Sequence, residues 1–361
     1  MKKIIIGFGT RPEVIKLAPV VKALELEGFN AVTVHTGQHD ELASDMLQLF
    51  GIQPSYDLKA MRPNQDLFEL TSFLLPELKR VYSLERPDAV IVQGDTTSSY
   101  LSALAAFYLQ IPVFHVEAGL RSHNLYDPFP EEMNRKQISV MANGHFVPTE
   151  LAKENLLAEG YSKNSIWVTG NTVVDALLRI MDSEAFINEP TPIYDTAKMV
   201  LVTSHRRENR GKPLENIMSA LMQLLEQNED ITIVFPAHPS PAVQEIVNSS
   251  RFTHPRLSIL PSTGYMPFLK LLNSADLILT DSGGIQEECA ALGKNVLVLR
   301  ETTERQELIH SGFTKLVGSN VALIVNEATA ALNANKVLDA QSIYGDGNAA
   351  LKIVKLLKTQ L

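Results

Sequence analysis

Short apolar runs alternate with amphipathic stretches along the first half of the chain. The runs contain many β-branched residues and little polar alternation, which is typical of strands covered by helices on both faces of a parallel sheet. The expected strands are residues 3–8, 31–36, 89–93, 112–116, 145–147 and 166–168. The expected helices are residues 41–50, 67–84, 98–109, 131–142 and 171–181. Strands that alternate with helices in this way predict a doubly wound α/β domain.

The same alternation restarts in the second half, after a segment of different composition. Residues 183–198 contain Pro190, Pro192, acidic side chains and little periodicity, and they are the expected linker. Further strands are expected at residues 199–203, 231–235, 257–260, 277–279 and 296–299, with helices such as 214–226 and 265–273. Because ligands of such sheets bind beyond the carboxyl ends of the strands, the two halves predict two Rossmann-like domains with an active-site cleft between them.

Composition and charge narrow the class of protein and of partner. Of the 361 residues, 45% are apolar and 20% are charged, an ordinary mix for a soluble globular protein. The 32 Lys and Arg residues against 41 Asp and Glu residues give a net charge of −9, which argues against a nucleic-acid partner. No run approaches the roughly 20 apolar residues that cross a bilayer, and the opening segment is too short for a signal peptide. We therefore expect a cytoplasmic protein with no membrane partner.

Cysteine and histidine usage excludes two further kinds of site. The single cysteine, Cys289, leaves no intrachain disulfide and no C-x-x-C spacing. No set of His, Asp and Glu residues has the spacing of a metal site, so no metal is expected.

Carboxylates follow the expected strands of the first half. Asp95 and Glu117 come directly after strands, and Glu131 opens an expected helix. Carboxylates that gather in a partly dry cleft raise one another's pKa and can divide the roles of acid and base. For Asp95 the competing interpretation is the N-cap of the next helix, and for Glu131 it is an ordinary acidic helix start.

Candidate anion-binding residues follow strands of the second half. Ser282, Gly283 and Gly284 precede an expected helix, where glycines let the backbone approach a ligand and free N–H groups suit a phosphate or diphosphate. Glu288, one turn later, could accept hydrogen bonds from ribose hydroxyls. The alternative is a simple N-cap and tight turn. The segment is neither a Walker A loop nor G-x-G-x-x-G, so neither ATP nor NAD is favoured.

A basic segment follows the first strand of the second half. It begins with His205 and Arg206, and arginine binds phosphate in a bidentate manner, while imidazole can donate to a leaving diphosphate. Arg11 offers the same chemistry after the first strand of the chain. The alternative interpretation is a solvated basic loop.

Several motifs, in order along the chain, resemble those of the bacterial non-hydrolysing UDP-N-acetylglucosamine 2-epimerases. They are GTRPE at 9–13, QGDTT at 93–97, HVEAGLR at 115–121, PFPEEMNR at 128–135, VTGNT at 168–172, HRREN at 205–209, DSGGIQEE at 281–288, TTER at 302–305 and YGDGN at 344–348. The resemblance extends from residue 3 to about residue 358. Several long motifs in family order are far more specific than any one of them.

The resemblance implies a fold and a reaction. The fold is GT-B-like, with a Rossmann-like domain over residues 1–180, a UDP-binding one over 195–344, and residues 345–361 crossing back to the first as its C-terminal helix. The reaction is the reversible epimerisation of UDP-GlcNAc to UDP-ManNAc at C2, by anti elimination of UDP to 2-acetamidoglucal and re-addition. The family acts without a cofactor, usually as a homodimer, and supplies cell-envelope polysaccharides.

The resemblance also implies roles for particular residues. Catalytic roles fall to Asp95, Glu117, Glu131 and His205. The substrate-binding residues it implies are Arg11, Lys16, Arg135, Arg206, His238, Ser282, Gly283, Gly284 and Glu288. In some relatives a second UDP-GlcNAc activates the enzyme from a neighbouring site, and the corresponding residues here are Gln38, His39 and Gln65.

Three other functions stay open from the sequence. A hydrolysing relative would add water to the glycal and release ManNAc and UDP. A GT-B glycosyltransferase would move the sugar to an acceptor and leave the C2 hydrogen in place. A UDP-sugar sensor would bind without turnover, but a pure diphosphate-sugar binder gains little from anions beside its ligand.

Overall fold

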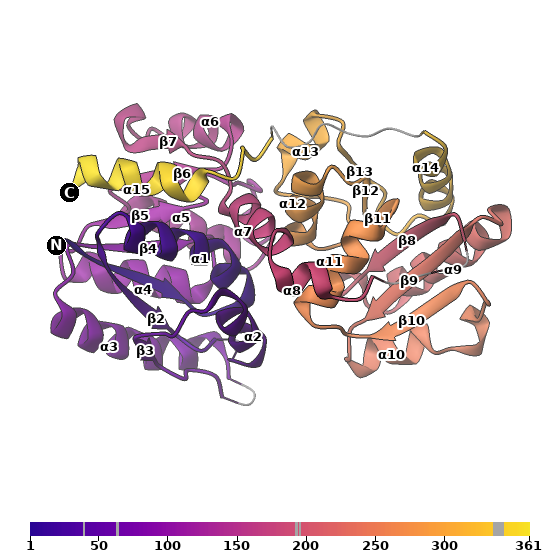
Figure 1. The fold of residues 1–361 in the computed structure, drawn as a ribbon, viewed down its shortest axis with the longest axis horizontal. Coiled ribbons are helices and arrows are strands. Elements are labelled where there is room, and N and C mark those ends of the chain that lie inside the picture. The colour runs from indigo at the N-terminus through magenta and orange to yellow at the C-terminus, as the bar shows by residue number, and fades with distance from the viewer. Residues whose placement is uncertain (39, 63–64, 192–193, 195, 335–342) are drawn as a thin grey trace. The chain divides into compact units, whose positions relative to one another are not determined.

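The chain folds into two compact units, each with its own parallel sheet (Figure 1). The computed structural model describes residues 1–38, 40–62, 65–191, 194, 196–334 and 343–361. The first unit comprises residues 1–178 and 344–361, and the second comprises residues 179–343.

The first unit is a sheet with strand order β3-β2-β1-β4-β5-β6-β7 and its covering helices. The strands are β1 Lys3–Phe8, β2 Asn30–His35, β3 Tyr56–Asp57, β4 Ala89–Gln93, β5 Val113–Val116, β6 Gly144–Val147 and β7 Ile166–Val168. The helices are α1 Arg11–Leu26, α2 Asp40–Phe50, α3 Leu67–Glu85, α4 Thr97–Tyr108, α5 Glu131–Met141, α6 Glu150–Ala158, the 3-10 turn η1 Lys163–Ser165, α7 Thr172–Met181 and α15 Ala349–Gln360.

The core of the first unit explains its apolar strands. Ile5 of β1 and Val90 of β4 are fully buried and share one core with Leu101 of α4. The neighbouring residues Ile4 and Ile6, on the other face of β1, are also fully buried. Both faces of the strand are thus covered, which is why the sequence is a continuous apolar run.

The C-terminal helix α15 is anchored within the first unit. The Asp175 carboxylate of α7 accepts hydrogen bonds from the backbone N–H groups of Ala349 (3.2 Å) and Ala350 (2.9 Å), which begin α15. These are N–H groups that a helix cannot satisfy itself, so Asp175 caps α15 from a distant part of the sequence. Gly170 has a φ of +93°, and a Cβ there would lie 2.8 Å from the backbone oxygen of Tyr344. Only glycine admits this close approach of the returning chain.

The second unit repeats the architecture with strand order β10-β9-β8-β11-β12-β13. The strands are β8 Lys198–Thr203, β9 Ile231–Ala237, β10 Leu257–Pro261, β11 Leu277–Thr280, β12 Val296–Val298 and β13 Thr314–Leu316. The helices are α8 Glu184–Asn188, the turn η2 Arg207–Asn209, α9 Lys212–Gln227, α10 Pro241–Val247, the turn η3 Ser250–Phe252, α11 Tyr265–Ser274, α12 Gly283–Leu292, α13 Gln306–His310 and α14 Val321–Asn333.

The strands expected from the apolar runs are present to within two residues. The strands β3 and β13 and the helices α6, α8, α10, α13 and α14 are not among the expected elements. The expected linker 183–198 contains α8, because the Ser183 hydroxyl accepts a hydrogen bond from the Phe186 N–H (3.2 Å) and starts a helix. Phe186 is buried, and the Lys270 ammonium lies 4.3 Å from the centre of its ring. One helical turn is too short to produce a periodic pattern. The same holds for β3 and β13.

Both sheets reverse their strand order at equivalent places. In the first sheet the chain leaves β1 and β4 toward opposite sides, and in the second sheet it does so at β8 and β11. Crevices form beyond the carboxyl ends of strands at such switch points. The residues that follow these four strands are therefore candidates for ligand binding.

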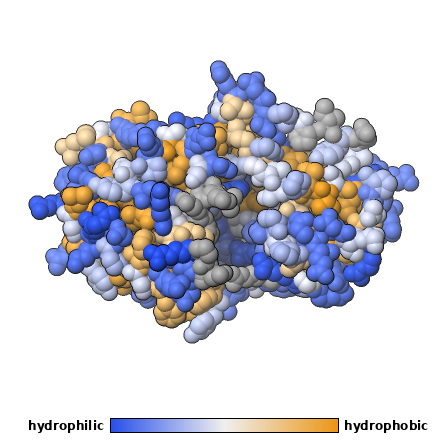
Figure 2. All heavy atoms as spheres, turned by 90° about the horizontal axis from the view of Figure 1, so that it is seen from below, coloured by the Kyte–Doolittle hydropathy of each residue, from blue (hydrophilic) through white to orange (hydrophobic). Residues whose placement is uncertain are grey.

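Among the helices that the structure describes, none is both long and apolar enough to cross a membrane. On the face drawn in Figure 2, hydrophilic and hydrophobic residues are interspersed.

Two buried histidines lie side by side in the first sheet. His115 of β5 is in register with His145 of β6, and both rings are almost fully buried. The His115 Nε2–H donates to the Gly94 backbone oxygen (2.8 Å). Burial lowers the pKa of His115 to about 3 and that of His145 to about 4, with the Arg121 guanidinium contributing to both. The folded protein thus holds both rings neutral.

We predict that these histidines make the protein sensitive to acid. The unfolded chain binds protons below the ordinary histidine pKa of about 6.5, whereas the folded chain does not until the pH approaches 4. The free energy of unfolding should therefore fall as pH falls from 7 to 5, by up to about 1.4 kcal/mol per pH unit for each ring. Urea titrations across this range measure it. His145→Gln should make the dependence shallower, and the exposed His310→Gln should leave it unchanged; equal slopes in all three proteins would contradict the prediction.

Candidate functional site

The predicted residues of the first half lie at one edge of the first sheet. Arg11 is the first residue of α1, directly after β1, and Asp95 and Glu117 follow β4 and β5. These strands are parallel neighbours, so their carboxyl ends share one edge. Glu131 is the first residue of α5, which starts from that same edge, and it is half-buried.

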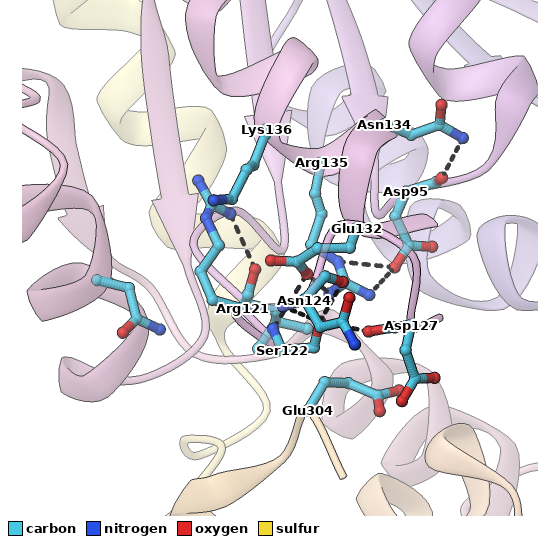
Figure 3. A network of polar contacts seen from close by, with 12 residues as sticks. Asp95, Arg121, Ser122, Asn124, Asp127, Glu132, Asn134, Arg135, Lys136 and Glu304 are labelled. Atoms are coloured by element: carbon cyan, nitrogen blue, oxygen red, sulfur yellow. Dashed lines mark hydrogen bonds and ion pairs between the residues drawn. The ribbon is translucent and has the colours of Figure 1, made fainter. Parts of the chain in front are cut away.

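Asp95 is held by a buried arginine on α5. The Nη2 and Nε atoms of Arg135 lie 2.7 Å and 3.0 Å from Asp95 Oδ2. Arg135 Nη1 donates to Glu132 Oε2, which also accepts from the Ser122 backbone N–H (3.0 Å). Figure 3 shows the guanidinium between the two carboxylates. The Asn134 amide donates to the Asp95 backbone oxygen (2.9 Å), so both the side chain and the main chain of Asp95 are fixed from α5.

Glu117 is the second carboxylate with a cationic partner. Its Oε2 forms an ion pair with the Lys16 ammonium of α1 and accepts from the Gln93 amide (2.9 Å). The pair is nearly buried, with 6% of the Lys16 side chain and 7% of the Glu117 side chain exposed. The backbone of Glu117 has a φ of +61°, a conformation that residues other than glycine rarely adopt. Such strain at a strand end is a physical hint of function.

Glu13 links the loops after β1 and β4. Its Oε2 accepts from the Gly9 backbone N–H (3.0 Å) and the Thr10 hydroxyl (2.7 Å). Its Oε1 accepts from the hydroxyls of Thr96 (2.7 Å) and Ser99 (2.5 Å). Glu13 is 1% exposed, so this carboxylate is satisfied entirely by the protein. In the sequence Glu13 stands out only as part of the GTRPE motif, since nothing local to it indicates its partners Thr96 and Ser99.

The N-terminus of α4 settles the competing interpretation of Asp95. Thr96, not Asp95, is the N-cap, because its hydroxyl accepts from the Ser99 N–H (3.1 Å). The side chain of Asp95 is therefore not used as a cap.

Of the residues predicted to bind an activating second UDP-GlcNAc, one contacts the start of α4. Gln38 Oε1 accepts from the hydroxyl (2.7 Å) and the N–H (3.2 Å) of Ser98, in the first turn of α4. Gln65 lies two residues before α3 and is half-buried. His39 lies outside the described residues.

In the second unit, Asp281 joins the loops after β8 and β11. It is 0% exposed, and its carboxylate accepts from the backbone N–H groups of His205 (3.0 Å) and Arg206 (3.1 Å). It also accepts from Ser204 Oγ (2.9 Å) and Asn209 Nδ2 (2.8 Å), and its Oδ1 lies 3.2 Å from His205 Nδ1. Burial on its own raises the pKa of the Asp281 carboxyl, but the hydrogen bond and charge of His205 outweigh it and lower the pKa.

Arg305 lies against the N-terminus of α12. A Cβ on Gly283 would be 2.3 Å from Arg305 Nη1, so glycine is needed there to admit the guanidinium. Arg305 is held by Glu287 (Nη2 to Oε1, 2.6 Å) and by an ion pair with Glu304. A cation is unfavourable beside the positive end of a helix dipole, so two carboxylates offset it. The arrangement places a guanidinium and helix N–H groups together, which suits a bound anion.

Glu304 connects Arg305 to a wider ionic network. Burial raises the pKa of the Glu304 carboxyl, but the charges of Arg305 and Arg300 outweigh it and hold the pKa far below its usual range. Arg300 Nη1 lies 3.0 Å from Glu304 Oε2, and Arg300 Nε lies 2.9 Å from Glu208 Oε1. Arg305 has no predicted role from the sequence, because its contacts with Gly283 and Glu287 join it to a helix that is distant along the chain.

The remaining predicted residues of the second unit are placed as follows. Ser282 is at the N-cap position of α12 without a capping hydrogen bond from its side chain. Glu288 is buried and accepts from the Tyr265 hydroxyl (2.8 Å). His238 follows β9 and is exposed, and partial burial with the nearby charge of His205 lowers its pKa. Arg206 Nε donates to the Asp281 backbone oxygen (3.0 Å).

Within the described part of the chain, no three or more His, Cys, Asp or Glu side chains are grouped so as to hold a metal ion. The carboxylates of interest belong to the first unit and the anion-binding candidates to the second. The cleft expected between them stays a prediction.

Comparisons with known proteins give one consistent family. The sequence matches the family described as UDP-N-acetylglucosamine 2-epimerase over residues 22–358. A UDP-N-acetylglucosamine 2-epimerase of Yersinia pestis is 46% identical over 369 residues, which cover 99% of this chain and 98% of that protein. The crystal structure of UDP-GlcNAc 2-epimerase from Neisseria meningitidis bound to UDP-GlcNAc matches with a TM-score of 0.91 at 40% identity, over 99% of this chain and 100% of that chain.

A more distant structure shares the fold alone. The glycosyltransferase of kitacinnamycin is 12% identical, with a TM-score of 0.68 over 100% of this chain and 99% of that chain. The expected fold class, two Rossmann-like α/β domains of the GT-B kind, is confirmed.

We predict that Glu13 is a major source of stability in the first unit. Glu13→Ala leaves buried donors of both loops without an acceptor, and we therefore expect the free energy of unfolding to fall by about 3 kcal/mol. Glu13→Gln keeps an acceptor on one side and should cost about 1 kcal/mol. Denaturant unfolding measures both. Glu25→Ala on the same helix is the matched control, because its side chain is 49% exposed and pairs with Lys22 at the surface. Equal losses for Glu13→Ala and Glu25→Ala would refute the assignment.

Proposed function

This chain belongs to the UDP-N-acetylglucosamine 2-epimerase family, and we propose that it interconverts UDP-GlcNAc and UDP-ManNAc reversibly without hydrolysing either. The observation that carries the proposal is the set of carboxylates at the carboxyl edge of the first sheet. Two of them, Asp95 and Glu117, are each held by a cation.

The reaction needs such groups because the C2 proton of the sugar is not beside a carbonyl. Deprotonation that leaves a carbanion at C2 is prohibitive at neutral pH. Elimination avoids the carbanion, because the electron pair of the C2–H bond moves into a new double bond. A base takes the C2 proton, the electron pair of the C2–H bond forms the C1–C2 double bond, and the C1–O bond breaks with its electron pair moving to UDP. Re-addition of UDP to C1, with a proton delivered to the opposite face of C2, gives the epimer.

The residues of the first unit are proposed to act on the sugar. Asp95, Glu117 and Glu131 share the acid and base roles and stabilise positive charge that develops at C1. Arg135 and Lys16 orient the first two of these carboxylates through the contacts described above. Arg11, at the start of α1, is proposed to contact the leaving diphosphate.

The residues of the second unit are proposed to hold UDP. The helix N-terminus at Ser282, Gly283 and Gly284 binds the diphosphate together with Arg305, whose guanidinium lies against Gly283. Glu288, oriented by the Tyr265 hydroxyl, accepts from the ribose hydroxyls.

Three side chains at the strand ends of the second sheet complete the proposed site. His205 stabilises the charge that develops on the diphosphate as it leaves. Arg206, the next residue after His205, and His238, which follows β9, are proposed to bind the nucleotide.

The resemblance also supports finer proposals about context. We propose that the protein acts as a cytoplasmic homodimer without a cofactor, and that its product supplies cell-envelope polysaccharides. A second UDP-GlcNAc beside the active site is proposed to contact Gln38 and Gln65, with His39 nearby in the sequence.

The test of the function is exchange of the C2 hydrogen with solvent. Incubation of UDP-GlcNAc in deuterium oxide should give UDP-ManNAc and deuterium at C2 in both recovered nucleotide sugars, followed by NMR. Free ManNAc at the earliest times indicates the hydrolysing reaction instead. Turnover with retention of the C2 hydrogen indicates a glycosyltransferase, and binding without turnover indicates a sensor; each of these results overturns the proposal.

The carboxylates are tested in the same assay. Asp95→Asn, Glu117→Gln and Glu131→Gln should each reduce exchange and epimerisation together by about 100-fold or more, because each removes an acid or base group. Glu77→Gln changes a half-buried carboxylate on α3 that is paired with Arg80, and as the control it should leave both rates unchanged. Wild-type rates in all three site variants would remove the carboxylates from the mechanism.

The contact between Gly283 and Arg305 predicts a specific pattern of UDP affinity. Gly283→Ala displaces the guanidinium from the helix N-terminus, and we expect the Kd for UDP to rise about ten-fold. Arg305→Gln should weaken UDP binding by a similar factor. Because both changes remove one interaction, the double variant should bind no more weakly than either single variant, as calorimetry would measure. Additive losses would contradict the idea that Gly283 acts through Arg305.

A further inference from the structure

Asp281 connects the two loops proposed to bind the diphosphate through hydrogen bonds to its carboxylate. It is the last residue before Ser282 and lies 77 residues from Ser204 in the sequence, yet contacts its hydroxyl. Its buried carboxylate accepts hydrogen bonds from the loop after β8 at the backbone N–H groups of His205 and Arg206 and at the side chains of Ser204 and Asn209.

One further contact of Asp281 is with the ring of His205. Asp281 Oδ1 lies 3.2 Å from His205 Nδ1. An ionised carboxylate can only accept hydrogen bonds, so Nδ1 must carry the proton that lies between them. Nε2 is on the opposite edge of the imidazole ring, away from Asp281. The His205 side chain is 46% exposed, whereas that of Asp281 is 0% exposed. The ring therefore contacts a buried carboxylate on one side and is open to solvent on another.

The chemistry of this arrangement is that of an oriented imidazole. A buried carboxylate bonded to one ring nitrogen fixes both the tautomer and the direction of the other nitrogen. The other donors to Asp281 fix the carboxylate itself, because each removes a direction in which it could turn.

We propose that Asp281 is a positioning residue that fixes the tautomer and orientation of His205, so that Nε2 faces the leaving diphosphate. This inference rests on the proposed function, in which His205 stabilises the negative charge that the diphosphate oxygen gains as the C1–O bond breaks, and Nε2 is the ring atom that does so when it carries a proton. Asp281 does not touch the substrate, and its effect on the reaction passes through His205.

A merely structural role for Asp281 makes a different prediction. A residue that only joins two loops would lower kcat, raise KM and weaken UDP binding together, whether or not His205 is present. A residue that acts through His205 loses its effect on kcat once the imidazole is gone. The two roles are therefore separated by a double-mutant cycle.

The experiment compares Asp281→Asn, His205→Gln and the double variant in the epimerisation assay. Asp281→Asn should lower kcat about 100-fold, with KM and the Kd for UDP within about three-fold of the wild type. In the His205→Gln background, the same change should lower kcat by less than about three-fold. Equal losses in both backgrounds, or a loss confined to KM, would overturn the inference.

Ser204→Ala is the matched control for the loop. It removes one hydrogen bond to the same carboxylate and leaves the contact with the ring intact. It should keep kcat within about three-fold of the wild type. A loss as large as that of Asp281→Asn would show that any change in the loop stops the reaction, which would also overturn the inference.

A measurement on the wild-type protein keeps the inference testable if Asp281→Asn does not fold. NMR of the 15N-labelled histidine rings, with His205 assigned by its absence in His205→Gln, reports the tautomer directly. The neutral ring should carry its proton on Nδ1, and a proton on Nε2 instead would refute the proposal. This readout does not depend on catalysis, so the tautomer is tested even if the deuterium-exchange assay overturns the proposed function.

Discussion

The requirement that a buried carboxylate be satisfied by donors shapes both candidate loops of this protein. Glu13 accepts from donors that follow β1 and β4, and Asp281, which directly follows β11, accepts from donors in the loop after β8. Each carboxylate lies at the switch point of its own sheet. A buried charge without partners is costly, so these two groups hold loops that would otherwise diverge. The loops joined in this way carry Asp95 in one unit and His205 in the other.

The residues proposed to act on substrate are in turn held by opposite charges. Asp95 is bound by Arg135, and Glu117 by Lys16. In the second unit the guanidinium of Arg305 is bound by Glu287 at the N-terminus of α12. Such pairs pre-organise charged groups before any ligand arrives, which reduces the cost of reorganisation during the reaction. The strained backbone of Glu117 is consistent with this, since strain persists only where the surroundings enforce it.

The apolar runs predicted the strands well except for the shortest, whereas the 13-residue helix α14 was not predicted. A strand such as β1 has a continuous apolar run because the protein covers both of its faces. The two residues of β3 and the single turn of α8 leave no such pattern. Helix α8 forms because a serine caps it and Phe186 is buried against neighbouring chain, and neither influence is local enough to detect by periodicity.

The sequence by itself determined the two α/β halves, the family motifs and the residue types at the strand ends, because these depend on periodicity and on groups that are adjacent in the chain. Only the tertiary structure decided which side chains act on one another. Glu13 meets Ser99 across 86 residues, and Asp281 meets His205 across 76. Arg305 lies against Gly283 because the fold returns there, which no spacing along the chain expresses. Hydrogen bonds and ion pairs depend on distances of about 3 Å in space, and only folding sets those distances.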